Sequence, residues 1–151
     1  MDDLRVAVIG VGRIGLAHAE NLCRRIRGAR LVAVTTSSPE RAAKVRRICD
    51  FQTVYPDVES LLGSERLDAV VIASSTSAHV ENVEQCAAAG FHILCEKPLG
   101  LSLSDCDRAV AAVRSAGVKL MMGHTRRFDA GYEEAIEFAK AKNVKIPGLT
   151  V

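Results

Sequence analysis

Short apolar segments alternate with helix-period segments along almost the whole chain, and this order restricts the fold more than any other feature. Six segments have the length and residue types of strands: 5–9, 31–35, 53–55, 69–73, 91–95 and 119–122. The fourth (AVVIA) is apolar without alternation, as in a strand covered on both faces of a parallel sheet. Strands that alternate with helices form βαβ units. The sequence therefore predicts an α/β fold, a three-layer, doubly wound parallel sheet of the Rossmann type.

Apolar residues at helical spacing predict helices between these strands. Serines mark three of the helix starts, at Ser38 before Pro39, at Ser77, and at Ser102 or Ser104. Four segments carry an apolar stripe: Gly15, Ala19, Leu22 and Ile26; Val80, Val83 and Ala87; Cys106, Ala109, Val110 and Val113; and Tyr132, Ala135, Ile136 and Ala139. Each stripe would cover one face of the sheet.

A glycine-rich turn follows the first strand and opens the first helix. Its sequence is Gly10-Val11-Gly12-Arg13-Ile14-Gly15. Glycines at this spacing permit a tight turn and close approach of the backbone to a pyrophosphate, and the helix amides then meet the phosphate charge. The turn predicts a dinucleotide site, with Arg13 and Ile14 among the residues that contact the cofactor.

The end of the second strand bears on the choice between NAD and NADP. NAD-selective sites usually carry Asp or Glu about 20 residues after the glycine turn. Here Thr35, Thr36 and Ser37 precede Ser38, and Arg41 follows one helical turn later. Without the acid, the hydroxyls, Arg41 and Arg13 could bind a 2′-phosphate, which tilts the cofactor prediction toward NADP. The alternative, that these residues only cap the next helix, stays open.

Three further strand ends should meet the same edge of the sheet, where ligands of doubly wound folds bind. Ser74-Ser75-Thr76 leaves room for a flat ring and its ribose. Glu96-Lys97-Pro98 follows the fifth strand, and His124 follows the sixth. We expect Lys97 to be catalytic, because an ammonium beside a nicotinamide can polarise the reacting oxygen and help move its proton, while Pro98 stiffens the backbone.

The remaining residues carry weaker signals. His18 and His92 are expected to be structural or exposed, while His79 and His124 stay open between packing and the site. The five cysteines are scattered and form no C-x-x-C pair, so neither a disulfide framework nor a metal site is predicted. The basic residues between Arg24 and Arg47 are not interleaved with aromatic side chains, so nucleic acid is not an expected partner.

Composition favours a soluble globular protein, with 48% hydrophobic and 25% charged residues. No apolar run has the length of about 20 residues that spans a membrane, and the residues after Met1 lack the order of a signal peptide. We therefore expect a cytoplasmic protein that does not bind membranes.

Three stretches resemble the glucose-fructose oxidoreductase and inositol 2-dehydrogenase family of NAD(P)-dependent enzymes: VIGVGRIG at the start, AAAGFHILCEKPLG in the middle and GHTRRFD after the sixth strand. The resemblance implies that Lys97 is the active-site lysine and that Glu96 supports the cofactor. It also implies that His79 lies near the cofactor and that Arg126 belongs to the site. The activity it implies is hydride transfer between NAD(P) and a small sugar, polyol (inositol-like) or related carbonyl substrate.

This sequence departs from the family pattern at two positions and in its extent. An acid is usual where Thr35 or Thr36 stands, and Asn or Met is usual in place of Thr125. We expect residues 1–145 to form the dinucleotide-binding domain and 146–151 to begin a C-terminal domain, which in this family supplies the substrate pocket with an Asp and a His. We expect the fragment to be inactive alone and the complete enzyme to be a homo-oligomer. The alternative is a stand-alone dinucleotide-binding or sensing module without catalysis.

Overall fold

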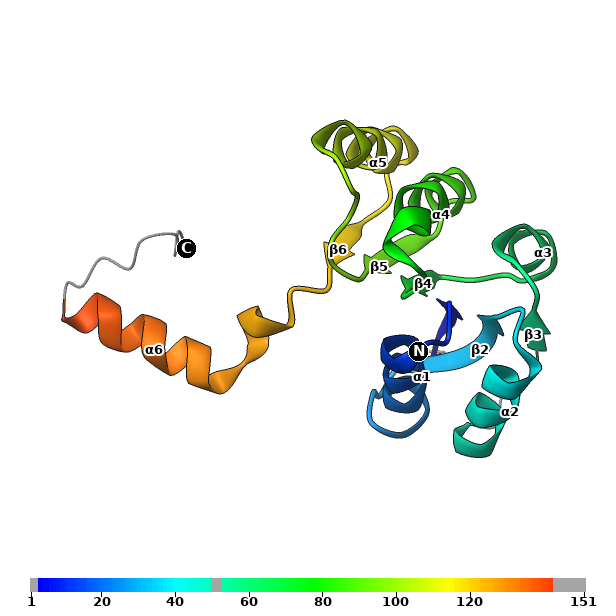
Figure 1. Ribbon diagram of the computed structural model, residues 1–151, viewed down its shortest axis with the longest axis horizontal. Helices are drawn as coiled ribbons and strands as arrows, with labels where there is room; N and C mark the ends of the chain where they lie inside the picture. The colour runs from blue at the N-terminus through cyan, green and yellow to red at the C-terminus, as the bar shows by residue number, and fades with distance from the viewer. Residues whose placement is uncertain (1–2, 50–52, 143–151) are drawn as a thin grey trace.

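Six parallel strands form one sheet in the computed structural model, which describes residues 3–49 and 53–142. The sheet order is β3-β2-β1-β4-β5-β6, and every neighbouring pair is parallel. This order confirms the predicted doubly wound sheet of the Rossmann type, and all six strands lie where the sequence predicts them (Figure 1). The strands are β1 Leu4–Ile9, β2 Ala29–Thr35, β3 Thr53–Tyr55, β4 Ala69–Ile72, β5 His92–Cys95 and β6 Leu120–Met122.

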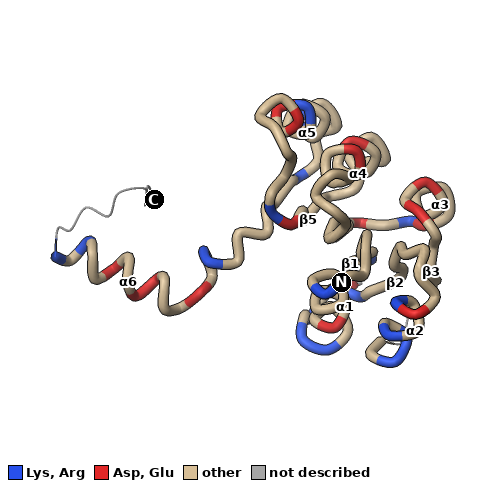
Figure 2. Tube along the Cα trace, in the orientation of Figure 1, with Lys and Arg blue, Asp and Glu red and all other residues tan. Residues whose placement is uncertain are grey.

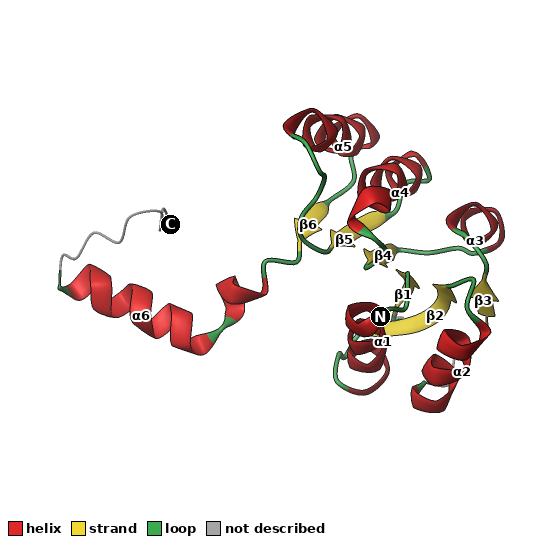
Figure 3. Ribbon diagram, in the orientation of Figure 1, coloured by secondary structure: helices red, strands yellow, loops and turns green. Residues whose placement is uncertain are grey.

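Helices cover both faces of the sheet and complete the predicted three layers. Helices α1 and α2 lie on one face, and α3, α4 and α5 lie on the other (Figure 3). The helices are α1 Arg13–Arg24, α2 Pro39–Ile48, α3 Val58–Ser64, α4 Thr76–Ala88, α5 Leu103–Ala116 and α6 Ala130–Ala141, with the 3₁₀ helix η1 Thr125–Phe128 before α6.

The two faces bury separate apolar cores because successive strand side chains point to opposite sides. In β1, Ala7 and Ile9 pack in the core beneath α3, α4 and α5, whereas Val6 and Val8 pack in the core beneath α1 and α2. The central strands are buried on both faces, which explains why they read as continuous apolar runs.

The observed helix starts agree with the predicted ones at two of the three serine positions. Ser38 caps α2 by accepting from the amide of Arg41, and Ser102 caps α5 by accepting from the amide of Asp105. The start predicted at Ser77 is wrong, because α4 begins at Thr76 after Ser75. Helices α3 and η1 were not predicted, because they span only 7 and 4 residues and are too short to display a helical period.

A disulfide joins α1 to the end of α2, and this corrects the prediction that the cysteines form no disulfide. Cys23 and Cys49 are paired, with their Cα atoms 5.7 Å apart and a sequence separation of 26. Cys23 lies in the last turn of α1, and Cys49 is the C-cap of α2. Neither lies in a C-x-x-C pattern, so their proximity comes from the packing of two helices on the same face of the sheet.

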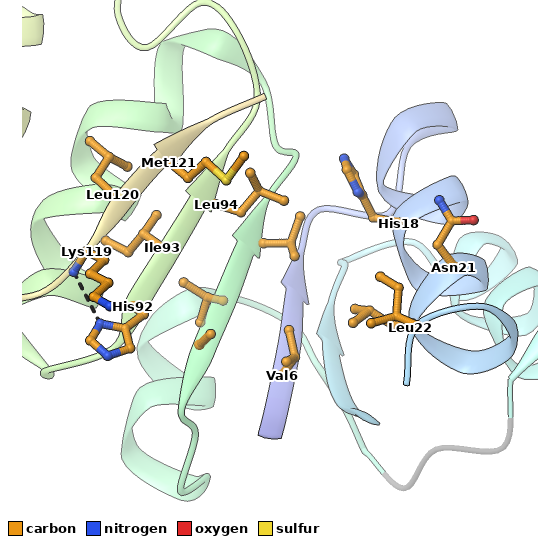
Figure 4. Close-up of a pocket in the computed structure, with 14 residues that line it drawn as sticks. Val6, His18, Asn21, Leu22, His92, Ile93, Leu94, Lys119, Leu120 and Met121 are labelled. Carbon is orange, nitrogen blue, oxygen red and sulfur yellow. Dashed lines mark hydrogen bonds between the residues drawn. The ribbon is translucent and has the colours of Figure 1, made fainter. Parts of the chain in front are cut away.

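On the α1 side, the sheet is uncovered over β5 and β6 in the described part of the chain, and an apolar groove lies there. Val6 and Leu22 line one side, and Leu94 and Met121 line the other (Figure 4). Helix α6 does not cover this groove, because it runs away from the sheet after β6 (Figure 1). Figure 2 shows acidic residues along α6 and basic residues on α2. The domain end predicted at residue 145 and the segment 146–151 lie outside the described residues.

None of the helices in the described ranges is both long enough and apolar enough to cross a membrane.

Candidate dinucleotide site

The carboxyl ends of β1 and β4 form the centre of the candidate site. These two strands are neighbours in the sheet, and the connections that follow them lead to helices on opposite faces. Ligands of doubly wound sheets bind at this change of direction. Gly10 follows β1 directly, and Ala73 and Ser74 follow β4.

The three glycines of the turn have different physical roles. Gly10 has a φ of +84°, and a Cβ there would lie 2.7 Å from the Cα of Ser74. A Cβ on Gly15 would overlap the carbonyl oxygen of Gly10, so this glycine lets α1 begin against the turn. A Cβ on Gly12 would meet no described atom within 4 Å. Gly10 and Gly15 are therefore required for packing, while Gly12 borders open space that a pyrophosphate could fill.

Two helix N-termini at this edge have no side-chain cap. The N-cap residues of α1 and α4, Gly12 and Ser75, make no capping hydrogen bond. In the same described ranges, α2, α3, α5 and α6 are each capped by a Ser or Asp side chain. The first amides of a helix need acceptors and carry partial positive charge. The two uncapped helices are the ones that follow the central strands, so their amides suit an anionic ligand.

Hydroxyl groups after β2 are mostly engaged by the backbone. Thr35 is 5% exposed, and its hydroxyl accepts from the amide of Gly10 at 3.1 Å. The hydroxyl of Thr36 accepts from the amide of Ser38 at 3.1 Å. Ser37 and Arg41 are exposed. Thr35 thus supports the glycine turn, and the side chains that remain open to a ribose or a 2′-phosphate are those of Ser37 and Arg41, with Arg13 exposed on the first turn of α1.

Lys97 lies in the loop after β5, next to the central strand β4. Its side chain is exposed, and no other described side chain forms a hydrogen bond or ion pair with it. The Lys97–Pro98 peptide bond is cis. The carbonyl oxygen of Pro98 lies 2.7 Å from Nδ1 of His79. Lys97 is therefore an available ammonium on an anchored loop, and its catalytic role stays a prediction.

His79 lies beneath the site, where it is 2% exposed. Its second ring nitrogen, Nε2, lies 3.2 Å from the carbonyl oxygen of Ser74. Asn82, one turn further along α4, donates to the hydroxyl of Ser74 at 2.9 Å. Both ring nitrogens of His79 face backbone carbonyls, so the geometry favours an indirect link to the cofactor rather than a direct contact.

A contact between α1 and the loop after β5 was not predicted. Nε2 of His18 and Oε1 of Glu96 are 2.8 Å apart, and both side chains are largely buried. A Cβ on Gly123 would lie 3.0 Å from the Glu96 carboxylate, so Gly123 leaves room for it. The available signal was the position of His18, three residues after Gly15. It did not identify Glu96, which is 78 residues away in sequence.

The other predicted residues lie at the same edge or beyond it. Ser75 and Thr76 begin α4, and Ile14 is partly exposed on the first turn of α1. Arg126, in η1, donates to Asp129 at 2.8 Å and lies 5.2 Å from the ring centroid of Tyr132. The hydrogen bond from Arg126 lowers the pKa of Asp129. Arg126 is therefore tied to the start of α6, and its predicted contact with the cofactor remains a prediction.

Comparison with known proteins matches this chain to an oxidoreductase family. The model of an oxidoreductase family with an NAD-binding Rossmann fold matches residues 4–124. Myo-inositol 2-dehydrogenase of Thermotoga maritima is 40% identical over 137 residues, which cover 89% of this chain and 41% of that protein. Inositol 2-dehydrogenase 3 of Saccharopolyspora erythraea is 39% identical over 145 residues, which cover 95% of this chain and 43% of that protein.

Solved inositol dehydrogenase structures share the fold of this chain. Myo-inositol 2-dehydrogenase from Lactobacillus plantarum superposes with a TM-score of 0.89 at 29% identity, covering 94% of this chain and 42% of that one. Scyllo-inositol dehydrogenase from Lactobacillus casei, solved with NAD(H) and scyllo-inositol, has a TM-score of 0.86 at 27% identity, covering 92% and 42%. The chain thus spans about two fifths of the length of the proteins it matches.

Proposed function

The chain belongs to the oxidoreductase family with an NAD-binding Rossmann fold, and on that premise we propose that it binds the cofactor of an inositol dehydrogenase-type enzyme. The reaction would transfer a hydride between the nicotinamide and a small sugar, polyol or related carbonyl compound. The substrate class is taken from the inositol dehydrogenases it resembles. We further propose a cytoplasmic homo-oligomer that acts without nucleic acid or a membrane surface. Sedimentation velocity of the natural gene product tests the oligomeric state.

One observation carries the proposal of a dinucleotide site. The helices that follow the two central strands begin without a side-chain cap, and the space beside Gly12 is open. Unpaired helix amides and a backbone without a Cβ are the features that a pyrophosphate needs. They coincide at the sheet edge where doubly wound folds bind ligands.

A charge introduced at Gly12 tests this site. We expect Gly12→Asp to keep the fold, because a Cβ there meets nothing within 4 Å and the position lacks a positive φ. Its carboxylate would repel the pyrophosphate, so the dissociation constant of NADH should rise at least about 100-fold, or about 2.8 kcal/mol. Gly63→Asp is the matched control, since Gly63 also borders open space but lies in α3. Equal NADH affinity in both variants would contradict the site.

The adenosine end of the site supports a preference for NADP. Thr35 or Thr36 stands where NAD-selective members usually have an acid, so no carboxylate opposes a 2′-phosphate at this position. Ser37, Arg41 and Arg13 are exposed nearby and can donate charge-assisted hydrogen bonds. We therefore propose NADP binding at least as tight as NAD binding.

Arg41→Ala tests the cofactor preference. Hydrogen bonds to charged groups contribute about 1.5–3 kcal/mol, so calorimetric titration should give about 10- to 100-fold weaker NADPH binding. NADH affinity should change less than about twofold, because the ribose hydroxyls do not need the guanidinium. Tenfold tighter binding of NADH than NADPH by the unchanged chain would rule out the preference itself.

The loop after β5 supports the proposed chemistry at the nicotinamide end. A bound nicotinamide supplies the hydride acceptor or donor. Lys97 would hold the reacting oxygen and move its proton, while Glu96 and Pro98 keep the loop in place. Ser74, Ser75 and Thr76 leave space at the end of β4, and Arg126 would contact the cofactor from η1. A sensing module without catalysis remains the alternative, and it would bind NAD(P)H without turnover of any polyol or sugar in the natural gene product.

A further inference from the structure

His79 is a buried histidine whose two ring nitrogens face two backbone carbonyls of the candidate site. Nδ1 lies 2.7 Å from the oxygen of Pro98, and Nε2 lies 3.2 Å from the oxygen of Ser74. A carbonyl oxygen only accepts, and a neutral imidazole has only one N–H to donate. The shorter distance favours Nδ1–H as the donor, in a hydrogen bond to the Pro98 carbonyl.

Ser74 is fixed from two directions. Asn82 donates to its hydroxyl at 2.9 Å, and the backbone of Gly10 packs directly against its Cα. Ser74 is therefore part of the same rigid unit as the glycine turn. His79 lies on the same helix as Asn82 and contacts Pro98, which is 19 residues away in sequence.

The loop after β5 needs such an anchor to hold Lys97 at a defined place. Pro98 has no N–H and cannot donate to the surrounding backbone. The Lys97 side chain is flexible and has no described partner, so the position of its ammonium depends on where the backbone holds its Cα. A displacement of about 1 Å in a reacting group can lower a rate about 100-fold.

We propose that His79 is a positioning residue that holds Lys97 against the nicotinamide end of the site through the bond from Nδ1–H to the Pro98 carbonyl. This inference rests on the proposed function, because it assumes that the cofactor reaches Lys97. It assigns His79 no contact with the cofactor or the substrate. The residue acts by fixing the loop to α4, the helix from which Asn82 holds Ser74.

Two conservative substitutions separate this role from packing alone. The amide nitrogen of Asn can occupy the place of Nδ1 of a histidine, whereas that of Gln reaches the place of Nε2. His79→Asn should therefore keep the bond to Pro98, and His79→Gln should lose it. A purely structural role would make both variants defective together. His92→Asn and His92→Gln are matched controls, because His92 accepts from the amide of Lys119 at the opposite end of β5.

The experiment measures how well NADH protects Lys97 from trace acetylation by acetic anhydride, with mass spectrometry of the 151-residue chain. We expect about tenfold protection in the unchanged chain, in His79→Asn and in both His92 variants. Protection should fall below about threefold in His79→Gln at saturating NADH. Equal protection in the two His79 variants would overturn the inference. Lack of protection in the unchanged chain would overturn the proposed place of the cofactor instead.

A second measurement needs no variant and covers the case in which His79→Gln fails to fold. Nitrogen-15 NMR of the unchanged chain reports which ring nitrogen of His79 carries hydrogen. We expect a slowly exchanging proton on Nδ1. A ring that is unprotonated at Nδ1 would overturn the inference, because Pro98 would then have no donor.

Discussion

At the scale of single residues, the candidate site is built from groups whose neighbours assign them to different tasks. Thr35 and His79 are buried, and their polar atoms face the backbone. Gly12, Arg41 and Lys97 border open space or solvent. The first group shapes the site, and the second group is available to a ligand. Residue type alone does not make this distinction, because burial and partners decide it.

Lys97→Ala should lower turnover far more than it weakens cofactor binding. Under the proposed function, the ammonium would act on the reacting oxygen, and loss of such a group typically costs about 10²- to 10⁴-fold in rate. The dissociation constant of NADH should change less than about threefold, because the glycine turn and the helix amides remain. Steady-state kinetics and a binding titration of the natural gene product give both values. Unchanged turnover in Lys97→Ala would contradict a catalytic role for Lys97.

At the scale of elements, the sequence predicted the parts of the fold that depend on local pattern. The six strands and the glycine turn follow from apolar runs and from one motif in its βαβ context. The contact between His18 and Glu96 and the disulfide between Cys23 and Cys49 could not be predicted in this way. Each contact joins elements that meet only after the sheet is assembled. The spacing of residues along one segment therefore does not predict that these side chains lie close together.

The disulfide fixes α1 to α2, whose N-termini border the glycine turn and Arg41. In the chain-entropy model, closing a loop of this length stabilises the folded state by about 3.5 kcal/mol. Cys23→Ser should therefore lower the midpoint of thermal unfolding of the oxidised chain, and dithiothreitol should remove the difference between variant and unchanged chain. Cys106→Ser is the control, because Cys106 is a free, partly exposed thiol.

Thiol labelling of the native chain checks the same pairing. Burial raises the pKa of Cys86 to about 12, and burial with the nearby Glu96 raises the pKa of Cys95 to about 12. At pH 8 only about one in 10,000 of either thiol is thiolate, so both should react slowly. We expect one fast-reacting thiol, Cys106, before reduction and additional labelling at Cys23 or Cys49 after it. Fast labelling of Cys23 without reductant would contradict the disulfide.

At the scale of the whole molecule, the cofactor site draws on elements from both halves of the sheet. The glycine turn belongs to the first half, and the ends of β4 and β5 belong to the second. The pair of His18 and Glu96 connects α1 of the first half to the loop after β5 of the second half. Unfolding of either half would therefore abolish binding, so ligand binding and global stability should be linked.

NADH should raise the midpoint temperature of thermal unfolding of the chain. The size of the rise should follow from the dissociation constant of NADH. A ligand that binds only the folded state at about 100 times its dissociation constant stabilises that state by about 2.7 kcal/mol. For a domain of this size, each kcal/mol shifts the midpoint by about 2–4 °C, so the expected rise is about 5–11 °C. Gly12→Asp should unfold at the same temperature as the unchanged chain without ligand, and its midpoint should rise by no more than about 1–2 °C at the same NADH concentration. Differential scanning calorimetry over a range of NADH concentrations provides the test. An unchanged midpoint at saturating NADH would mean that the two halves of the sheet do not form one cofactor site.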